Sequence, residues 1–283
     1  MIVRVPATSA NMGPGFDSLG VALTLWAELG LVDDDGQLPD GAQRADDHHL
    51  ATVAFALFGG AGRLWVRSPI PMGRGLGYSA AVRVGGLLLA AAQQAGPEAD
   101  VIALHREEVL SIATRLEGHA DNAAPALLGG VVASTGERSI RVPLRFDPAV
   151  VVWVPSFSTR TDQSRSKLGT AVPLADAVFN IGRVAYLVAA LAFGDIDALR
   201  HGTEDRIHQP LRFTDSPGSQ AAHAAALANG AWCSWLSGSG PTVAALCSVE
   251  SSDELAEAMA ASAGGVGHTK VLRVDHGGAA IEH

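Results

Sequence analysis

The stretch from Pro71 to Ala81 has the residue types and spacing of an anion-binding loop. It reads Pro-Met-Gly-Arg-Gly-Leu-Gly-Tyr-Ser-Ala-Ala, with glycine at positions 73, 75 and 77. Glycine adopts positive φ at little cost and lets another group approach the backbone closely. The apolar run over 80–94 that follows predicts a buried helix. A glycine-rich loop that opens a helix presents unpaired N–H groups and the positive end of the helix dipole, so the stretch predicts a phosphate-binding loop.

A flexible turn before a core helix would have the same composition, so the loop by itself leaves both interpretations open. Two better-known phosphate loops are excluded. No Lys-Ser or Lys-Thr pair ends the stretch, as a P-loop requires, and the Gly-x-Gly-x-Gly spacing is not that of the dinucleotide-binding fingerprint.

Three further loops combine glycine with polar side chains, and they lie far apart in the chain. They are Asn11–Asp17, Glu117–Asn122 and Leu236–Thr242. Polar groups at fixed positions in loops are often functional. Plain solvated connections are the alternative, and in the second loop a capping turn with Asp121 or Asn122 as N-cap would look the same.

Composition limits the classes of function. The chain has 283 residues, 48% of them apolar, which suffices for one large domain or two modest ones. The formal charge of −9 argues against nucleic acid or an anionic membrane surface as a partner. An anionic substrate would therefore need local arginines.

The chain is expected to be soluble and cytoplasmic. Cys233 and Cys247 both lie in apolar surroundings, which suits two buried thiols in a reducing compartment. The N-terminus lacks the pattern of a signal peptide. Apolar runs such as 184–193 are far too short to span a bilayer, so no membrane partner is expected.

The predicted elements mix helices and strands, which indicates an α+β fold. A shift in composition near Pro148 predicts two domains, 1–148 and 149–283. Strands are expected over 2–5, 21–32, 64–66, 150–154, 243–247 and 270–274, a hairpin over 131–144, and helices over 50–57, 80–94, 101–116, 175–193, 196–206, 220–227 and 253–261. Asp46 or Asp47 could cap the first helix, and 208–212 is expected to be a loop.

The four loops, in this order, resemble those of the GHMP small-molecule kinases. Within that superfamily the His119-Ala120-Asp121-Asn122 and Asn11–Asp17 segments resemble the homoserine kinases, and so do Leu174–Asn180 and Glu204–Pro210. The resemblance covers nearly the whole chain. It implies a two-domain fold, with a ribosomal-protein-like N-terminal domain and a ferredoxin-like C-terminal domain. It also implies transfer of the γ-phosphoryl group of ATP, with Mg²⁺, to the side-chain hydroxyl of L-homoserine in threonine biosynthesis.

The residue types suit an amino-acid substrate. An ammonium group needs a carboxylate, for which Asp17 is the candidate, and a carboxylate suits a guanidinium fork, for which Arg165 and Arg212 are candidates. The resemblance favours these roles over solvated surface charges. Asn11, His119 and Asn122 could hydrogen-bond the other polar groups of the substrate.

Phosphoryl transfer depends mainly on positioning and charge neutralisation, so a strong general base is not required. Asn122 occupies the place of the aspartate base of mevalonate kinases and is expected to orient the hydroxyl, with Ser79 as the second catalytic residue. The loop around Gly238 is expected to pack against the first glycine loop. Together the two loops would bind ATP through Pro71, Gly73, Arg74, Gly75, Leu76, Gly77, Tyr78, Ser79, Ala80, Ala81, Gly238, Ser239 and Gly240.

Two positions depart from the family pattern. Tyr78 stands where the loop normally has serine, and a phenol cannot place its oxygen where that hydroxyl would be. Ser111 aligns with a metal-binding glutamate, so Glu107 or Glu108, one helical turn earlier, would have to replace it. The expected metal ligands are therefore Ser79 and Glu108.

Three interpretations stay open. The chain could be a homoserine kinase, a GHMP kinase for another small alcohol such as shikimate, mevalonate or pantoate, or a non-catalytic ligand-binding homologue. The complete amino-acid pocket favours the first over the second, and only the altered phosphate loop supports the third. A homodimer is also left open.

Overall fold

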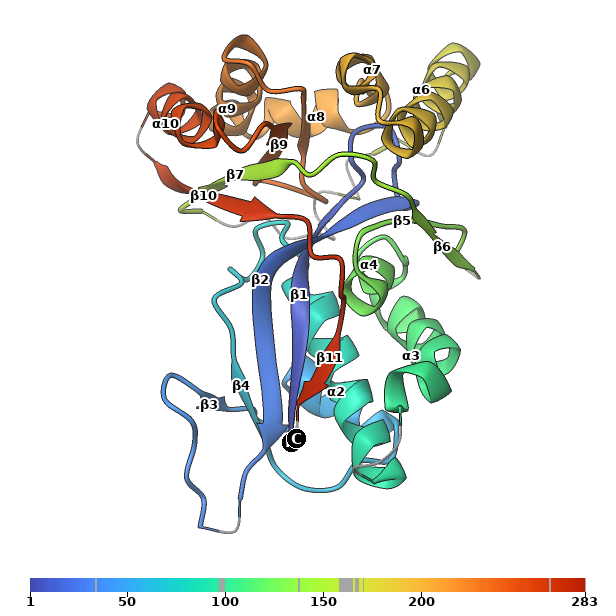
Figure 1. Cartoon of the computed structure of the whole chain (residues 1–283), viewed down its shortest axis with the longest axis vertical. Coiled ribbons are helices and arrows are strands. Elements are labelled where there is room, and N and C mark those ends of the chain that lie inside the picture. The colour runs from blue at the N-terminus through green and yellow to red at the C-terminus, as the bar shows by residue number, and fades with distance from the viewer. Residues whose placement is uncertain are drawn as a thin grey trace.

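Two antiparallel sheets, each with helices on one face, organise the molecule (Figure 1). The structure is a computed structural model, and it describes residues 1–33, 35–96, 100–136, 138–157, 165, 168–169, 171–264 and 266–282.

The first sheet is built around two long strands, β1 (Ile2–Ala10) and β2 (Leu19–Leu31). Residues 19–21 of β2 pair with β5, and residues 28–31 pair with β4, so this one strand joins both ends of the sheet. The strand order is β11-β1-β2-β4-β3, with β5 beside β2 and β6 beside β5. The remaining strands are β3 (Gln43–Arg44), β4 (Leu64–Arg67), β5 (Val131–Ser134), β6 (Ser139–Val142) and β11 (Ala280–Glu282).

The central helix of this half is α2 (Tyr78–Ala95), which packs against β1 and β2. Most of its residues are Ala, Val, Leu or Gly, and the helix is buried along most of its length. Gly86 lets α1 (Leu50–Leu57) approach closely, since a Cβ there would lie 2.3 Å from the Ala51 carbonyl oxygen. Beside α2 lie α3 (Val101–Glu117) and α4 (Ala123–Leu128) (Figure 1).

The second sheet has the order β10-β7-β9-β8, and helices α6 to α10 lie on one of its faces (Figure 1). Trp153 and Trp235 belong to strands of this sheet, and both are buried. The strands are β7 (Ala149–Pro155), β8 (Cys233–Leu236), β9 (Val243–Cys247) and β10 (Gly267–Arg273). The helices are α6 (Leu174–Phe193), α7 (Ile196–Gly202), α8 (Gln209–Thr214), α9 (Pro217–Ala228) and α10 (Ser252–Ser262).

Several local expectations differ from the structure. The first strand continues from Val5 to Ala10, because pairing with β2 keeps this polar segment extended. The side chain of His49 caps α1 in place of Asp46 or Asp47, and the expected loop at 208–212 lies largely in α8. The short strands β8 and β11 were not predicted.

The last strand returns to the first half of the chain. β11 pairs with β1, and Val274 forms a bridge with Leu23. The end of the expected second domain, 149–283, is therefore part of the first sheet. The division at residue 148 stays a prediction.

The apolar run at 184–193 is part of a longer helix. Among the described residues, α6 is the one helix that is long and apolar enough to cross a membrane, by length and composition only. It has 20 residues, and 22% of its most apolar window is buried. The sequence predicted this helix over 175–193, and it begins ten residues before the apolar run, so that it includes Asp176 and Asn180.

Candidate active site

A cleft between the two halves of the molecule collects residues from all four polar loops. It encloses about 840 Å³ of space, part of it continuous with solvent. Its lining residues are Asn11, Phe16, Asp17, Leu50, Pro71, Met72, Gly73, Gly75, Gly77, Tyr78, Ser79, His119, Asp121, Asn122, Arg165, Arg212, Gly238 and Ser239. The loops therefore form one site, as the sequence predicted.

The three glycines of the first loop all have positive φ, with values of 65°, 78° and 67° at Gly73, Gly75 and Gly77. Close packing also requires two of them. A Cβ at Gly75 would lie 2.2 Å from the Ser237 carbonyl oxygen, and one at Gly77 would lie 1.9 Å from Thr8 Oγ1. The loop thus needs glycine both for its conformation and for contact with other parts of the protein.

The second glycine loop packs against the first, as expected. Ser237 Oγ lies 2.5 Å from the Gly75 carbonyl oxygen, to which it donates, and 2.7 Å from Ser9 Oγ. The Gly238 N–H donates to the Ala10 carbonyl at 3.1 Å. These contacts join both halves of the molecule at the base of the cleft.

Of the residues expected to bind ATP, eight line the cleft: Pro71, Gly73, Gly75, Gly77, Tyr78, Ser79, Gly238 and Ser239. Leu76, Ala80 and Ala81 are buried in the core, and Gly240 packs on Leu236. These four residues hold the loops in place and are not among the cleft-lining residues.

Arg74 also has a different position from the one expected. Its guanidinium donates to the carbonyl oxygens of Pro155 at 2.9 Å, Ser156 at 2.7 Å and Met72 at 3.1 Å. These bonds connect the glycine loop to the end of β7. Arg74 is not among the residues that line the cleft.

Ser79 contacts a carboxylate that the sequence analysis missed. Its hydroxyl donates to Glu117 Oε2 at 2.8 Å, and the other oxygen of Glu117 pairs with Arg83. The side chain of Glu117 is only 7% exposed. Its position directly before Gly118-His119, at the end of a helix, was the available signal.

Glu108 is not brought to this position. It lies nine residues before Glu117, which corresponds to roughly 13 Å along α3. Its side chain is 61% exposed and lies 3.4 Å from His105 Nδ1. Ser111 is likewise absent from the cleft lining.

Tyr78 lines the cleft, and so do the apolar residues Leu50, Pro71 and Met72. Its hydroxyl is 3.1 Å from His49 Nε2, while His49 Nδ1 accepts the Ala51 N–H at 3.1 Å. Nδ1 is therefore unprotonated in the neutral ring, and Nε2–H donates to the phenol. Burial lowers the pKa of His49 despite the nearby charge of Asp46, which favours this neutral form.

The loop at 11–17 holds a strained backbone. Asn11, Met12 and Asp17 have φ of 71°, 44° and 57°, a region that side chains other than glycine rarely adopt. Asn11 stabilises it, because its Nδ2 donates to the Gly238 carbonyl at 2.9 Å and its Oδ1 accepts the Asp17 N–H at 3.1 Å. Such strain is concentrated at functional sites.

Asp17 lies among charged partners. Its Oδ1 is 2.6 Å from Arg165 Nη2, and its carboxylate, His119 and Asp121 each offer an atom within 4.8 Å of the others. His119 Nδ1 is 2.5 Å from Asp121 Oδ1. Burial lowers the pKa of His119, but the hydrogen bond and charge of Asp121, with Asp17 and Glu117, outweigh it and raise the pKa above 6.5.

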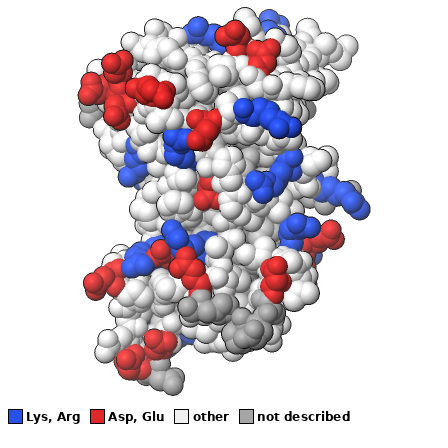
Figure 2. All heavy atoms as spheres, in the orientation of Figure 1, with Lys and Arg blue, Asp and Glu red and all other residues white. Residues whose placement is uncertain are grey.

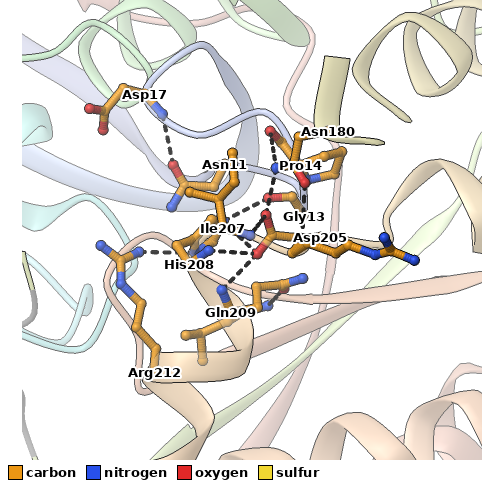
Figure 3. Close-up of polar contacts among 12 residues, drawn as sticks. Asn11, Gly13, Pro14, Asp17, Asn180, Asp205, Ile207, His208, Gln209 and Arg212 are labelled. Atoms are coloured by element: carbon orange, nitrogen blue, oxygen red, sulfur yellow. Dashed lines mark hydrogen bonds and ion pairs between the residues drawn. The ribbon is translucent and has the colours of Figure 1, made fainter. Parts of the chain in front are cut away.

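Arg212 lines the cleft, and its side chain is buried. Its Nη1 donates to the Gly238 carbonyl at 2.9 Å and to His208 Nδ1 at 3.2 Å (Figure 3), while its Nε has no partner. Burial and the nearby charge of Arg165 lower its pKa to about 10. Among the described residues, it forms no ion pair with a carboxylate.

A buried network positions Arg212 (Figure 3). Asp205 accepts the backbone N–H groups of Ile207, His208 and Gln209 at 2.7 to 3.0 Å. His208 Nε2 donates to the Gly13 carbonyl at 2.7 Å, which leaves Nδ1 free to accept from Arg212. Asp205 thus fixes the start of α8, from which Arg212 projects.

Asn180 connects the same network to the strained loop. Its Nδ2 donates to Asp205 Oδ1 at 2.6 Å and to the Pro14 carbonyl at 3.3 Å. The two segments that resemble the homoserine kinases around Asn180 and Asp205 therefore contact each other, and together they hold the loop at 11–17 and the start of α8 in place.

Phe16 was not among the predicted site residues. The guanidinium carbons of Arg165 and Arg212 lie 5.2 and 5.3 Å from the centre of its ring. An aromatic residue directly before Asp17 in a polar loop was the available signal. The ring holds the two guanidinium groups in place by cation–π contacts.

Asn122 is bound on both sides of its amide. Its Oδ1 accepts from Thr8 Oγ1 at 2.7 Å, and its Nδ2 is 3.4 Å from Asp121 Oδ1. The side chain lines the cleft next to Gly77. The structure thus brings all six residues expected to bind the substrate into one cleft: Asn11, Asp17, His119, Asn122, Arg165 and Arg212.

Comparison with family models agrees with this architecture. The model described as GHMP kinases N terminal domain matches residues 40–130, and the model described as GHMP kinases C terminal matches residues 187–265.

Curated relatives cover most of the chain. A homoserine kinase of Moorella thermoacetica is 43% identical over 263 residues, 87% of either chain. A homoserine kinase of Gloeobacter violaceus is 42% identical over 93% of this chain and 92% of its own. The crystal structure of homoserine kinase from Cytophaga hutchinsonii matches with a TM-score of 0.84 and 28% identity, covering 100% of this chain and 97% of that one. A mevalonate kinase structure, at a TM-score of 0.70 and 12% identity, shares the fold.

Proposed function

We propose that this chain, which belongs to the GHMP kinase family, is a homoserine kinase. The family makes it an ATP-dependent small-molecule kinase with a phosphoryl-accepting alcohol. L-Homoserine as that alcohol is supported by the relatives and by the chemistry of the cleft. In this proposal the reaction is a step of threonine biosynthesis and takes place in the cytoplasm.

Arg212 carries the proposal. A buried guanidinium without a carboxylate partner among the described residues is costly unless a ligand supplies the negative charge. The α-carboxylate of an amino acid fits this need, with Arg165 as its second contact. Asp17 Oδ1 is engaged by Arg165, and its other oxygen can accept the α-ammonium group.

The nucleotide occupies the other end of the cleft in this proposal. The N-terminal N–H groups of α2 and the backbone of the two glycine loops receive the phosphates. Leu50, Pro71, Met72 and Tyr78 form an apolar wall for the base. Because the phenol of Tyr78 bonds to His49, its ring turns towards α1, and we expect it to leave the phosphates to Ser79 and the backbone.

The reaction forms a bond between the homoserine side-chain oxygen and the γ-phosphorus, and breaks the bond from that phosphorus to the β-γ bridging oxygen. Asn122 orients the homoserine hydroxyl. The hydroxyl proton goes to a phosphate oxygen or to water, because the amide of Asn122 cannot accept it. The buried setting and fixed N–H donors stabilise the charge on the transferred group.

Mg²⁺ belongs to the proposal as a partner of ATP. Ser79 and Glu117 offer a hydroxyl and a carboxylate oxygen 2.8 Å apart, which are the hard oxygen donors that Mg²⁺ prefers. These two residues would hold it, and Arg83 would orient the carboxylate. Bound there, Mg²⁺ would neutralise charge on the phosphates.

A substrate panel tests the function. Purified protein with Mg²⁺-ATP is offered homoserine, shikimate, mevalonate and pantoate, and the phosphorylated product is identified by mass spectrometry. O-Phosphohomoserine should be the main product. Preferential phosphorylation of another alcohol would assign the cleft to a different GHMP kinase, and no turnover with any of them would favour a ligand-binding homologue.

A further inference from the structure

A second cavity lies away from the cleft, where the chain crosses between the two sheets. It encloses about 640 Å³ of space, part of it continuous with solvent. None of its described lining residues lines the cleft, so the cavity is separate from the site of the proposed reaction. We call it the crossing cavity, and it is lined by Gly130, Val131, Arg141, Val142, Pro143, Leu144, Arg145 and His276.

Two arginines and a histidine line the crossing cavity. Arg141 is on β6, Arg145 is in the segment 143–148 that leads to β7, and His276 is in the segment 274–279 that leads from β10 to β11. Figure 2 shows Lys and Arg side chains on the right of the molecule, at the level where Figure 1 labels β5 and β6. No carboxylate is among the described lining residues, although the chain has a formal charge of −9. The cavity therefore gathers positive charge and N–H donors in an acidic protein.

The two guanidinium groups form no ion pair with a carboxylate of the described residues. The described carboxylates nearest along the chain have other partners. Asp147 pairs with Arg273. Asp275 accepts from Trp26 Nε1 at 2.9 Å and from the backbone N–H of Gly278 at 2.7 Å. An anion from solution would therefore not compete with these carboxylates for the arginines.

Backbone contacts hold the walls of the crossing cavity in place. A Cβ at Gly130, where φ is 71°, would lie 3.4 Å from Arg141 Nε, so this side chain lies across the glycine. The Gly130 N–H donates to the Asp275 carbonyl at 2.6 Å, which fixes the segment that follows β10. The Arg145 N–H donates to the Leu191 carbonyl at 3.3 Å, which fixes the segment before β7 to α6. Because these walls are already formed, binding a ligand there costs little ordering of the backbone.

We propose that the crossing cavity binds a phosphate monoester, with the phosphate group on Arg141, Arg145 and His276. The guanidinium N–H groups form a planar fork that matches phosphate geometry. A phosphate monoester offers three acceptor oxygens and about two negative charges, whereas a carboxylate offers two oxygens and one charge. A nucleic acid is disfavoured as the source of the phosphate, because the whole chain has a formal charge of −9.

The remaining lining favours an organic group on the phosphate. Val131, Val142, Pro143 and Leu144 contribute apolar side chains, and the cavity is larger than a phosphate group alone requires. Apolar surface that the organic group removes from water adds to the affinity. We therefore expect a phosphate ester to bind more tightly than inorganic phosphate.

Isothermal titration calorimetry with phenyl phosphate tests the proposal. The wild type should bind this probe, and Arg141→Gln and Arg145→Gln should each raise its Kd roughly tenfold or more, because each removes a charged donor. Arg138→Gln is the matched control, since Arg138 is exposed directly before β6 and is absent from the cavity lining, and its Kd should equal that of the wild type. No binding by the wild type, or an unchanged Kd in both cavity variants, would overturn the proposal.

Two further probes test the class of ligand. Benzoate has the same ring with a carboxylate in place of the phosphate, and it should bind roughly tenfold more weakly than phenyl phosphate or worse. Inorganic phosphate should also bind more weakly, because it leaves the apolar lining uncovered. Benzoate that binds as tightly as phenyl phosphate would overturn the assignment to phosphate. Inorganic phosphate that binds as tightly would contradict the organic group.

Histidine NMR signals of the wild type locate the bound probe. The ring signals of His276, identified by their loss in His276→Gln, should shift during titration with phenyl phosphate and give the Kd found by calorimetry. His119 lines the cleft and reports on a probe bound there. Shifts of His119 without shifts of His276 would place the probe in the cleft and overturn the proposal. None of these outcomes bears on the kinase reaction, which the substrate panel tests separately.

Thermal unfolding tests whether the site exists only in the folded protein. A ligand that binds the folded chain alone raises the unfolding midpoint, so a saturating concentration of phenyl phosphate should raise the Tm of the wild type and of Arg138→Gln. The rise should be smaller in the Arg141→Gln/Arg145→Gln double variant at the same concentration. An equal rise in all three proteins would show that the stabilising site lies elsewhere and would contradict the proposal.

Discussion

Arg212 draws its role from two properties of one side chain, burial and the lack of a carboxylate partner among the described residues. Its guanidinium bonds to a carbonyl and to His208, so the charge is oriented without a direct ion pair to a described carboxylate. Asp205 stabilises this arrangement by accepting hydrogen bonds from the backbone N–H of His208 and from the side chain of Asn180 (Figure 3). The cleft thus keeps a fixed positive group ready for an anionic substrate.

The Arg212→Ala variant should raise the KM for homoserine roughly 30- to 1,000-fold, the equivalent of about 2–4 kcal/mol, because the substrate carboxylate loses its buried partner. The KM for ATP should change far less. Arg206→Ala is the control, since Arg206 is 54% exposed, stacks on Phe179 and is absent from the cleft lining. Equal effects on both substrates would assign Arg212 to the fold or the phosphates.

His119 should titrate above its usual value of 6.5, because Asp121, Asp17 and Glu117 favour its charged form more strongly than burial opposes it. Histidine NMR signals followed from pH 5 to 9 measure this pKa. In Asp121→Asn the pKa should fall, since the largest favourable partner is lost. An unchanged pKa in that variant would mean that the short contact at 2.5 Å contributes no charge stabilisation.

Substitutions of Tyr78 and Ser79 should affect kcat differently. Tyr78→Ser should leave kcat unchanged or increase it, because it restores a hydroxyl beside the phosphates. Ser79→Ala should lower kcat on the order of a hundredfold, as for the loss of one well-aimed donor. Loss of turnover in Tyr78→Ser together with an unaffected Ser79→Ala would identify the phenol as a catalytic group.

At the scale of elements, helix α2 has a glycine at each end, and only one of the two is in close contact with other parts of the protein. Gly77, before its first turn, and Gly96, after its last, both have positive φ. A Cβ at Gly96 would meet nothing within 4 Å, whereas one at Gly77 would meet Thr8 Oγ1 and Asn122 Oδ1. Only Gly77 therefore couples the helix to the cleft.

Alanine at these two positions separates strain from contact. Gly96→Ala should cost about 1–3 kcal/mol of unfolding free energy, because φ of 79° with ψ of 174° is a backbone region almost confined to glycine, and it should leave the KM for ATP unchanged. Gly77→Ala should also lower the unfolding free energy, and it should raise the KM for ATP, because Thr8 must move and the loop with it. Urea unfolding and initial rates measure both. An unchanged KM for ATP in Gly77→Ala would show that the contact with Thr8 is easily relieved.

At the scale of the whole molecule, folding keeps some histidines neutral. Burial lowers the pKa of His223 on α9 to about 4, and the charge of Arg200 adds to this effect. Its ring stacks on Phe213 and bonds to Ser234 at 3.0 Å, so it belongs to the core of the second sheet. His208 is also buried, and burial lowers its pKa in spite of Asp205.

The protein should lose stability as pH falls from about 6.5 to about 4. In that window the unfolded chain binds a proton at His223 that the folded chain does not, so the unfolding free energy rises with pH. The loss is at most roughly 3 kcal/mol for this group. Urea unfolding at several pH values should show a shallower dependence in His223→Gln, with exposed His48→Gln as the control. Identical pH profiles for the wild type and His223→Gln would rule out this linkage.

Local patterns in the sequence determined the loops, most of the elements and the family. The glycines at 73, 75 and 77, followed by an apolar run, predicted positive φ and a buried helix, and both are present. Such signals are readable because they reflect backbone sterics and burial, which act over a few residues. The substrate residues could be proposed because their charges are complementary to an amino acid.

Only the tertiary structure decided which groups meet. Glu117 reaches Ser79 because α3 ends beside the start of α2, and alignment along the chain had pointed to Glu108 instead. Arg74 bonds to carbonyls at the end of β7, 81 residues away, and β11 returns to β1 across the whole sequence. These contacts depend on how elements pack in three dimensions, and no local property of Glu117, Arg74 or β11 encodes the partner that each one finds.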